Sequence, residues 1–155
     1  MSEGRLYFVM EFISGAMLPK ASPQVANRRF SEEQVRCLIA QLVVGLGQLH
    51  QNQIMHGDLK LGNLMLDGEG YLKIINFSKA KRLVGGTKSN SRCGSEEIMA
   101  PEILRKEYYD FQADWWAVGI VAHQLMFAYH PFKTANVTRK MYEQAVLNQD
   151  LELPN

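Results

Sequence analysis

The segment DFQADWWAVGIVAHQLMFAYH, residues 110–130, limits the possible folds more than any other part of the chain. It is apolar nearly all round, and such a helix has to be buried in a protein core or a membrane. His123 and Gln124 interrupt its apolar run, which falls short of the ~18 apolar residues that a membrane span needs. We therefore expect a buried helix in the core of a compact domain, with no membrane insertion.

A second long helix is predicted over residues 31–51. Ser31 is its expected N-cap, and Glu32 and Glu33 in the first turn suit the positive end of the helix dipole. The apolar residues then recur at three- and four-residue steps, which is typical of an amphipathic helix. They are Val35, Leu38, Ile39, Leu42, Val43, Leu46 and Leu49.

Shorter patterns predict a few strands. RLYFVMEFI, residues 5–13, is rich in aromatic and β-branched residues and is expected to be a strand that ends where Gly15 and Pro19 break regular structure. LMLD (64–67) and YLKIIN (71–76) are two further strands, joined by GEG as a hairpin.

Two regions follow the hairpin. Residues 78–102 have no apolar period and many small polar residues, so we expect a long mobile loop. TANVTRKMYEQAVLNQ, residues 134–149, is typical of a third, amphipathic helix.

Composition excludes several classes of protein. The 155 residues carry 17 Lys and Arg against 16 Asp and Glu, a net charge of +1, so we expect no nucleic-acid partner. Cys37 and Cys93 are far apart and have no metal-ligand spacing, so reduced thiols are favoured over a disulfide or a metal site. MSEGRLYFVMEF has no signal-peptide pattern, and a cytoplasmic location is expected.

Four motifs stand in a fixed order along the chain. They are HGDLKLGN (56–63), NFS (76–78), APE (100–102) and DWWAVG (114–119). This order resembles that of the eukaryotic protein kinases, with H-R-D-L-K-x-x-N, D-F-G and A-P-E in the matching places. LYFVMEF and CGSEEIMAPEI extend the resemblance, which is closest to the cyclic-nucleotide-dependent (AGC) group of serine/threonine kinases.

The resemblance implies a fold and a division of the chain. The expected class is α+β, mainly α: a kinase-like large (C-terminal) lobe with a hinge strand and a small catalytic-loop hairpin, the N-terminal lobe being absent. Its parts are expected at 1–18 (hinge region), 31–51 (long helix), 54–80 (catalytic and metal loops), 81–102 (activation segment) and 111–155 (further helices).

The same resemblance assigns catalytic roles. Phosphoryl transfer requires two oxygens in line and neutralisation of phosphate charge. Asp58 is expected to orient the substrate hydroxyl and accept its proton, and Lys60 to neutralise the transferred group. Asn63 offers an oxygen to magnesium, and the Ser95 hydroxyl bonds Asp58 and Lys60. His56 and Phe77 match the family's hydrophobic spine.

Nucleotide binding is also implied by the family. Adenine contacts fall to backbone groups near Glu11 and Ile13, with Met10 as gatekeeper and Met65 packed under the ring. Ordinary core roles for Met10 and Met65 remain open and are compatible with this assignment, because an adenine pocket is an apolar cleft. The implied cofactors are ATP and Mg2+.

The sequence departs from the family pattern at the metal. Asn76 replaces the Asp that holds the magnesium bridging the phosphates, so Asn63 and Asn76 are the expected metal ligands and neither carries charge. Hard cations favour carboxylates, so weakened ATP and Mg2+ binding is expected.

A second departure is Gly57, which stands in place of the Arg of H-R-D. In the family that Arg pairs with a phosphorylated residue of the activation segment, which aligns with Ser91. Lys81 remains as a point charge near it.

Three functional hypotheses follow. The first is a serine/threonine kinase-like domain that transfers phosphate from ATP to protein, weakly or not at all by itself. The second is a pseudokinase that acts as an interaction module, and the third is a non-functional kinase fragment. The expected partners are a protein substrate or a regulatory protein, with self-association through exposed surface around Met10 and Met65.

Overall fold

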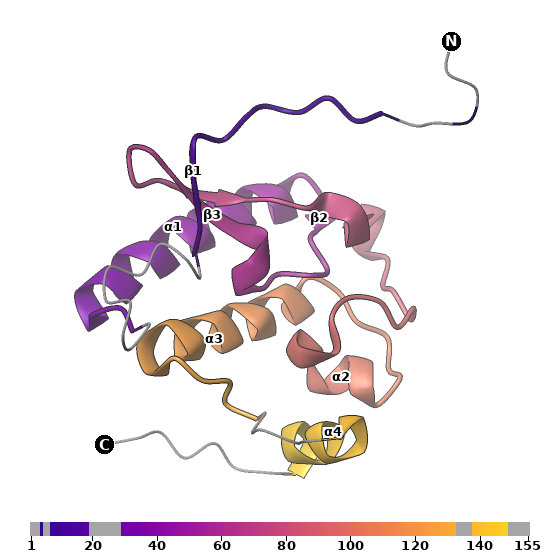
Figure 1. Cartoon of the computed structure of the whole chain (residues 1–155). Helices are drawn as coiled ribbons and strands as arrows, with labels where there is room; N and C mark the ends of the chain where they lie inside the picture. Colours follow the sequence, from indigo (N-terminus) through magenta and orange to yellow (C-terminus); the bar gives the residue numbers. More distant parts are fainter. Residues whose placement is uncertain (1–3, 5–6, 19–28, 133–137, 149–155) are drawn as a thin grey trace.

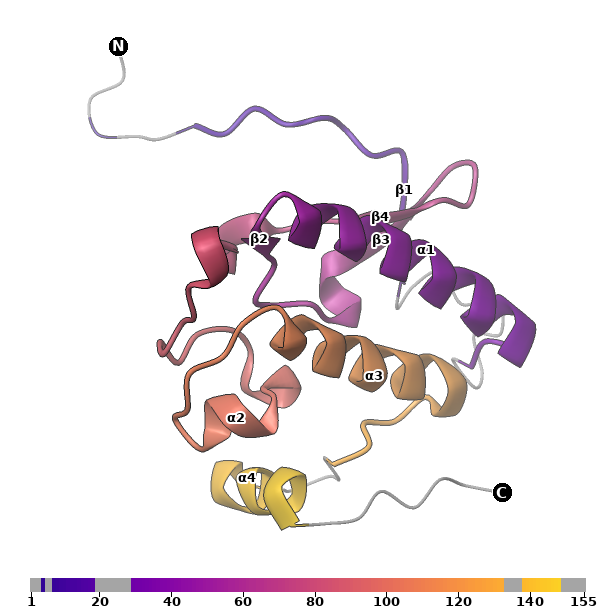
Figure 2. The ribbon, with the colours of Figure 1, turned by 180° about the vertical axis from the view of Figure 1, so that it is seen from behind.

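The computed structural model describes residues 4, 7–18, 29–132 and 138–148. The helices α1 (Glu32–Gln51) and α3 (Gln112–Phe127) cross the middle of the molecule, α1 against the sheet and α3 beneath it (Figures 1 and 2). Two shorter helices, α2 (Pro101–Leu104) and α4 (Arg139–Asn148), lie together on the far side of α3 from the sheet.

The α1 helix begins where the sequence predicts. Ser31 is its N-cap, and a capping box is complete: the Ser31 hydroxyl accepts from Gln34 N, and Gln34 Oε1 accepts from Ser31 N at 2.9 Å. The predicted apolar face is buried at Val35, Leu38, Leu42 and Leu46. Val43, which the sequence pattern placed on the same face, is instead 41 % exposed.

The α3 helix is buried only in part. Its first-turn residue Asp114 and seven further residues are buried, which confirms the prediction of a core helix. One face reaches the surface, where Trp115 is 39 % exposed and Met126 36 % exposed. The prediction of burial all round was therefore wrong for that face, because apolar composition does not fix how many sides a neighbour covers. Among the described residues no helix is both long and apolar enough to cross a bilayer.

The strands form two small sheets. The three-stranded sheet has the order β1 (Gly15–Met17), β3 (Leu64–Asp67) and β4 (Leu72–Ile74), all antiparallel. The β3–β4 pair is the predicted hairpin, in register with Leu64 opposite Ile74. β2 (Ile54–Met55) pairs with β5 (Lys81–Arg82), and this ladder lies beside the catalytic loop.

The strand prediction at residues 5–13 was wrong. Residues 7–13 are extended but pair with no described strand, and β1 begins only at Gly15, a residue expected to break regular structure. Extended sequences rich in aromatic and β-branched residues become strands only where a neighbour offers an edge. Residues 5 and 6, and Pro19 with the rest of 19–28, lie outside the described residues.

The segment 81–102 is irregular, as predicted, but short elements interrupt it. It contains β5, 3₁₀ turns at Val84–Gly86 and Glu96–Ile98, and the start of α2. Ser89 also bridges Tyr109. The third helix was predicted from residue 134; residues 133–137 lie outside the described part, and α4 begins at Arg139.

The capping box gives a test of α1. Ser31→Ala removes the acceptor for Gln34 N and should lower the free energy of unfolding by about 1 kcal/mol. Ser31→Asp keeps an acceptor and should stay within about 0.5 kcal/mol of the natural chain. Urea denaturation followed by circular dichroism measures both, and equal losses would contradict the capping role.

Candidate functional site

Four predicted site residues meet between β2 and the 3₁₀ turn at Glu96–Ile98. The Asp58 carboxylate accepts from Ser95 N through Oδ1 at 2.7 Å and from Asn63 Nδ2 through Oδ2 at 3.1 Å. Lys60 Nζ donates to the Ser95 hydroxyl at 2.5 Å. The structure thus brings Asp58, Lys60, Asn63 and Ser95 into one hydrogen-bonded group, in which the Ser95 hydroxyl bonds Lys60 and its backbone N–H bonds Asp58.

The environment keeps Asp58 ionised. Burial by itself raises the pKa of the carboxyl, but hydrogen bonds from Ser95, the charge of Lys60 and the amide of Asn63 outweigh it, so the pKa lies below its usual value. An ionised carboxylate is the state that can accept a proton from a hydroxyl group. The stabilisation this gives the fold is present above the unfolded pKa and is lost as pH falls through the folded pKa.

Asp114 holds the backbone of the loop in place. Its two oxygens accept from His56 N at 2.8 Å and Gly57 N at 2.9 Å, and His50 Nε2 lies 2.9 Å from the carboxylate. Asp114 is only 2 % exposed. Asp114 therefore anchors the backbone of the loop at residues 56 and 57, while the contact from His50, in the last turn of α1, has no sequence signal.

The two candidate metal ligands face each other. Asn76 Nδ2 donates to Asn63 Oδ1 at 3.1 Å, and the amide of Asn63 donates to the Asp58 carbonyl at 2.7 Å. Asn76 lies in the left-handed region with φ 65°, and its own Oδ1 accepts from Ser78 N. Both amide oxygens therefore already accept hydrogen bonds within the protein.

His56 and Phe77 also meet as predicted. The His56 ring is fully buried and lies edge-on to Phe77, with 5.2 Å between the ring centroids. His56 Nε2 is 3.1 Å from the Ile75 carbonyl. This contact joins the catalytic loop to the segment that carries Asn76.

Gly57 occupies a position that other residues would strain. Its φ is +73°, and a Cβ built there would lie 2.8 Å from the Lys79 carbonyl oxygen. Gly94 approaches from the activation segment, with φ +96° and a Cβ position 2.4 Å from the Gly57 carbonyl oxygen. The glycine in place of Arg thus allows two backbone segments to pack closely.

The segment around Ser91 is held by Lys81. The ammonium of Lys81 donates to the hydroxyls of Ser91, Ser89 (2.9 Å) and Tyr109 (3.0 Å). Lys81 was named from the sequence as the charge near Ser91, and the structure confirms the contact. Tyr109 was missed, since no motif marks it.

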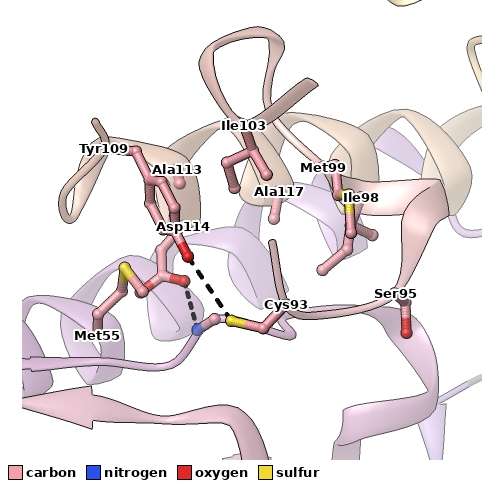
Figure 3. Close-up of a pocket in the computed structure, with 11 residues that line it drawn as sticks. Met55, Cys93, Ser95, Ile98, Met99, Ile103, Tyr109, Ala113, Asp114 and Ala117 are labelled. Atoms are coloured by element: carbon pink, nitrogen blue, oxygen red, sulfur yellow. Dashed lines mark hydrogen bonds between the residues drawn. The ribbon is translucent and has the colours of Figure 1, made fainter. Parts of the chain in front are cut away.

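Cys93 lies at the edge of the same cluster and faces a small cavity (Figure 3). Its Sγ is 3.6 Å from Tyr109 Oη, and the cavity, of about 10 Å³, also borders Gly57 and Asp114. That volume suits a single water molecule. Both cysteines are free thiols, as predicted.

The predicted adenine contacts do not meet in one pocket. Met10, Glu11 and Ile13 belong to the extended segment before β1, which runs away from the body of the molecule (Figure 1). Met10 is 82 % exposed, whereas Met65 lies in β3 opposite Met17. A hollow of about 430 Å³ does lie between α1 and β3, but neither Met10 nor Met65 lines it.

Comparisons with known proteins agree with the motifs. A family model described as the protein kinase domain matches residues 1–154. The chain is 37 % identical over 150 residues to the serine/threonine-protein kinase sgk-1 of Caenorhabditis elegans, covering 96 % of this chain and 32 % of that protein.

Two mouse proteins give similar values. Identity is 36 % over 151 residues to the serine/threonine-protein kinase Sgk2, of which 40 % is covered, and 35 % over 151 residues to protein kinase C eta type, of which 22 % is covered. Each match covers 97 % of this chain. The chain therefore spans about a third of the length of the curated relatives it matches.

Asp114 offers a test of the loop anchor. Asp114→Asn keeps one oxygen acceptor but turns an NH₂ group toward a backbone N–H, leaving a buried donor unpaired. We expect the free energy of unfolding to fall by about 2–4 kcal/mol, measured in urea. Asp110→Asn is the matched control: Asp110 accepts from Gln112 N at 3.0 Å, an Asn can still do so, and the loss should stay within about 0.5 kcal/mol.

Gly57 offers a second test. Gly57→Ala places a Cβ against the Lys79 carbonyl at positive φ and should destabilise the fold by roughly 1–3 kcal/mol. Gly47→Ala, in α1 with nothing within 4 Å of the new Cβ, should instead stabilise by up to ~1 kcal/mol. Thermal unfolding compares the two, and a neutral Gly57→Ala would contradict the close backbone approach.

Proposed function

The chain belongs to the protein kinase family, its relatives are serine/threonine kinases of the AGC type, and from this membership we propose a kinase-like domain with weak or no phosphoryl transfer by itself. The activity in question is transfer of the γ-phosphoryl group of ATP to a protein Ser or Thr hydroxyl. The hydrogen bond from Asn76 to Asn63 carries the proposal, because Asn76 places a neutral amide where the family pattern has the Asp that holds the metal.

Hydrogen bonds and charge support the proposed roles of Asp58 and Lys60 in the reaction. Asp58 is ionised and has both oxygens oriented by hydrogen bonds, so it is suited to orient a substrate hydroxyl and accept its proton. Lys60, held by Ser95, is suited to neutralise charge on the transferred group. We propose Asp58 and Lys60 as the catalytic residues, with Ser95 as the residue that positions both.

The two candidate metal ligands, Asn63 and Asn76, fit Mg2+ poorly. Mg2+ prefers carboxylate oxygens in octahedral geometry, and Asn63 and Asn76 supply amide oxygens that already accept hydrogen bonds. No group of three His, Cys, Asp or Glu side chains that could hold a metal is present in the described part of the chain. We propose that this chain binds Mg2+ with ATP weakly.

We also propose nucleotide contacts from the resemblance to the protein kinases. That resemblance gives the adenine to Met10, Glu11 and Ile13, together with Met65. In the structure Met10 is exposed, so these residues must move relative to the sheet to enclose a base. This need for rearrangement adds to the weak binding expected from the neutral ligands.

An interaction module is the second candidate function. The catalytic loop is satisfied by its own hydrogen bonds, and an exposed apolar segment at residues 7–12 offers a surface for a protein partner or for self-association. The free thiols of Cys37 and Cys93 support a cytoplasmic setting.

Asn76→Asp tests the proposal directly. In the natural chain, ATP should raise Tm by a similar small amount with and without Mg2+, because the site adds no charge for the metal. The Asp variant supplies a carboxylate, so Mg2+ should increase the ATP-dependent shift. A thermal-shift titration of ATP at constant ionic strength measures both.

Asp67→Asn is the control for a change of charge elsewhere on the hairpin. It should leave the ATP-dependent rise in Tm unchanged, both with and without Mg2+. A natural chain whose ATP shift deepens strongly with Mg2+, together with peptide phosphorylation that Asp58→Ala abolishes, would overturn the proposal.

A further inference from the structure

An exposed apolar arm precedes the sheet. We define the arm as residues 7–13, which are extended, pair with no described strand and project from the body of the molecule (Figures 1 and 2). Val9 is 97 % exposed, Phe12 88 % and Phe8 76 %, and Tyr7 and Met10 are also mostly exposed. Single exposed apolar residues are ordinary, but a contiguous run of this kind marks an interaction surface.

The arm leads into a strand with an open edge. β1 forms one side of the sheet, and β3 is its one neighbour among the described strands. Gly15 and Ala16 in β1 are exposed. Such an edge presents unpaired N–H and C=O groups that can accept a further strand.

We infer that two copies of this chain exchange arms, the arm of each copy adding as a strand along the β1 edge of the other. This deepens the self-association proposed above by naming its surfaces. In an antiparallel pairing with the two-fold axis at Phe12, Met10 lies opposite Ser14 and Val9 opposite Gly15 of the second copy. Reciprocal exchange closes a symmetric dimer in which both β1 edges are paired.

Strand addition suits the chemistry of the arm. Its backbone groups supply the hydrogen bonds of a new ladder, and its aromatic and β-branched side chains favour a strand once a neighbour is present. The arm joins a three-stranded sheet, which is more stable than an isolated two-stranded ribbon.

Pairing within one chain is disfavoured by the sequence. For the arm to fold back on its own β1, residues 11–14 would have to form the hairpin loop. That loop reads Glu-Phe-Ile-Ser, and its two central residues, Phe12 and Ile13, are not the Gly, Asn or Asp that tight hairpin turns favour there. The donor arm and the acceptor edge therefore meet more readily between two copies than within one.

The available surface is large enough. Tyr7, Phe8 and Phe12 are each at least two thirds exposed, and an aromatic side chain can bury ~150–250 Å². Two arms together present aromatic surface on the order of 1,000 Å², before Val9 and Met10 are added. Stable interfaces begin at about 1,200 Å² in total.

Sedimentation velocity on the full 155-residue chain tests the exchange. The natural chain should sediment as a dimer that dissociates on dilution. Val9→Lys places a charge in the new strand and should give a monomer at the same concentration. Val44→Lys changes another exposed valine, 68 % exposed on α1, and should leave the dimer intact.

A designed turn distinguishes arm exchange from nonspecific hydrophobic association. Phe12→Asn with Ile13→Gly creates an Asn-Gly turn that lets the arm fold back on its own β1, so this variant should be monomeric. Phe12→Asn with Ile13→Ala has the same loss of apolar surface at residue 12 but no such turn, and should still form a dimer, at a higher concentration than the natural chain needs.

Four results would overturn the inference. They are a monomeric natural chain at all concentrations, open-ended assembly, a dimer that survives Val9→Lys or the Asn-Gly change, or a dimer lost in Val44→Lys or the Asn-Ala variant. Oligomeric state is measured without nucleotide, whereas the proposed kinase-like function is tested by the change that Asn76→Asp makes in the response of Tm to ATP and Mg2+, so either proposal can fail while the other stands.

Discussion

The buried carboxylate of Asp114 is the interaction on which the rest of the site depends. It accepts two backbone hydrogen bonds from the catalytic loop and contacts His50, so it ties the first turn of α3 to the loop and to the last turn of α1. A buried charge is tolerated only where such partners satisfy it. The loop between β2 and β3 is therefore positioned by the two longest helices rather than by its own hydrogen bonds alone.

A second group of contacts builds outward from that anchored loop. With the backbone at His56 and Gly57 in place, Asp58 reaches Ser95 and Asn63, and Lys60 reaches Ser95. Gly57 and Gly94 allow the activation segment to approach the loop closely enough for these contacts. The side chains that would act on a substrate hydroxyl are thus in place before any substrate arrives, which is the arrangement that electrostatic catalysis requires.

The metal side of the site is organised differently. Asn76 donates to the amide oxygen of Asn63, which is favourable for the fold and unfavourable for a hard cation. This contrast between an ionised proton acceptor and two neutral amides is the basis of the proposal of weak phosphoryl transfer.

Sequence by itself determined the family, the order of the motifs, both long helices and the hairpin. These features depend on local periodicity and on residue types at fixed spacing, which the chain carries directly. Only the tertiary structure decided the hydrogen bond between Asn63 and Asn76 and the contacts of His50 and Tyr109. It also decided that residues 7–13 pair with no described strand. Each of these depends on which group lies opposite in space, and a strand-like sequence without a neighbouring edge remains an extended arm.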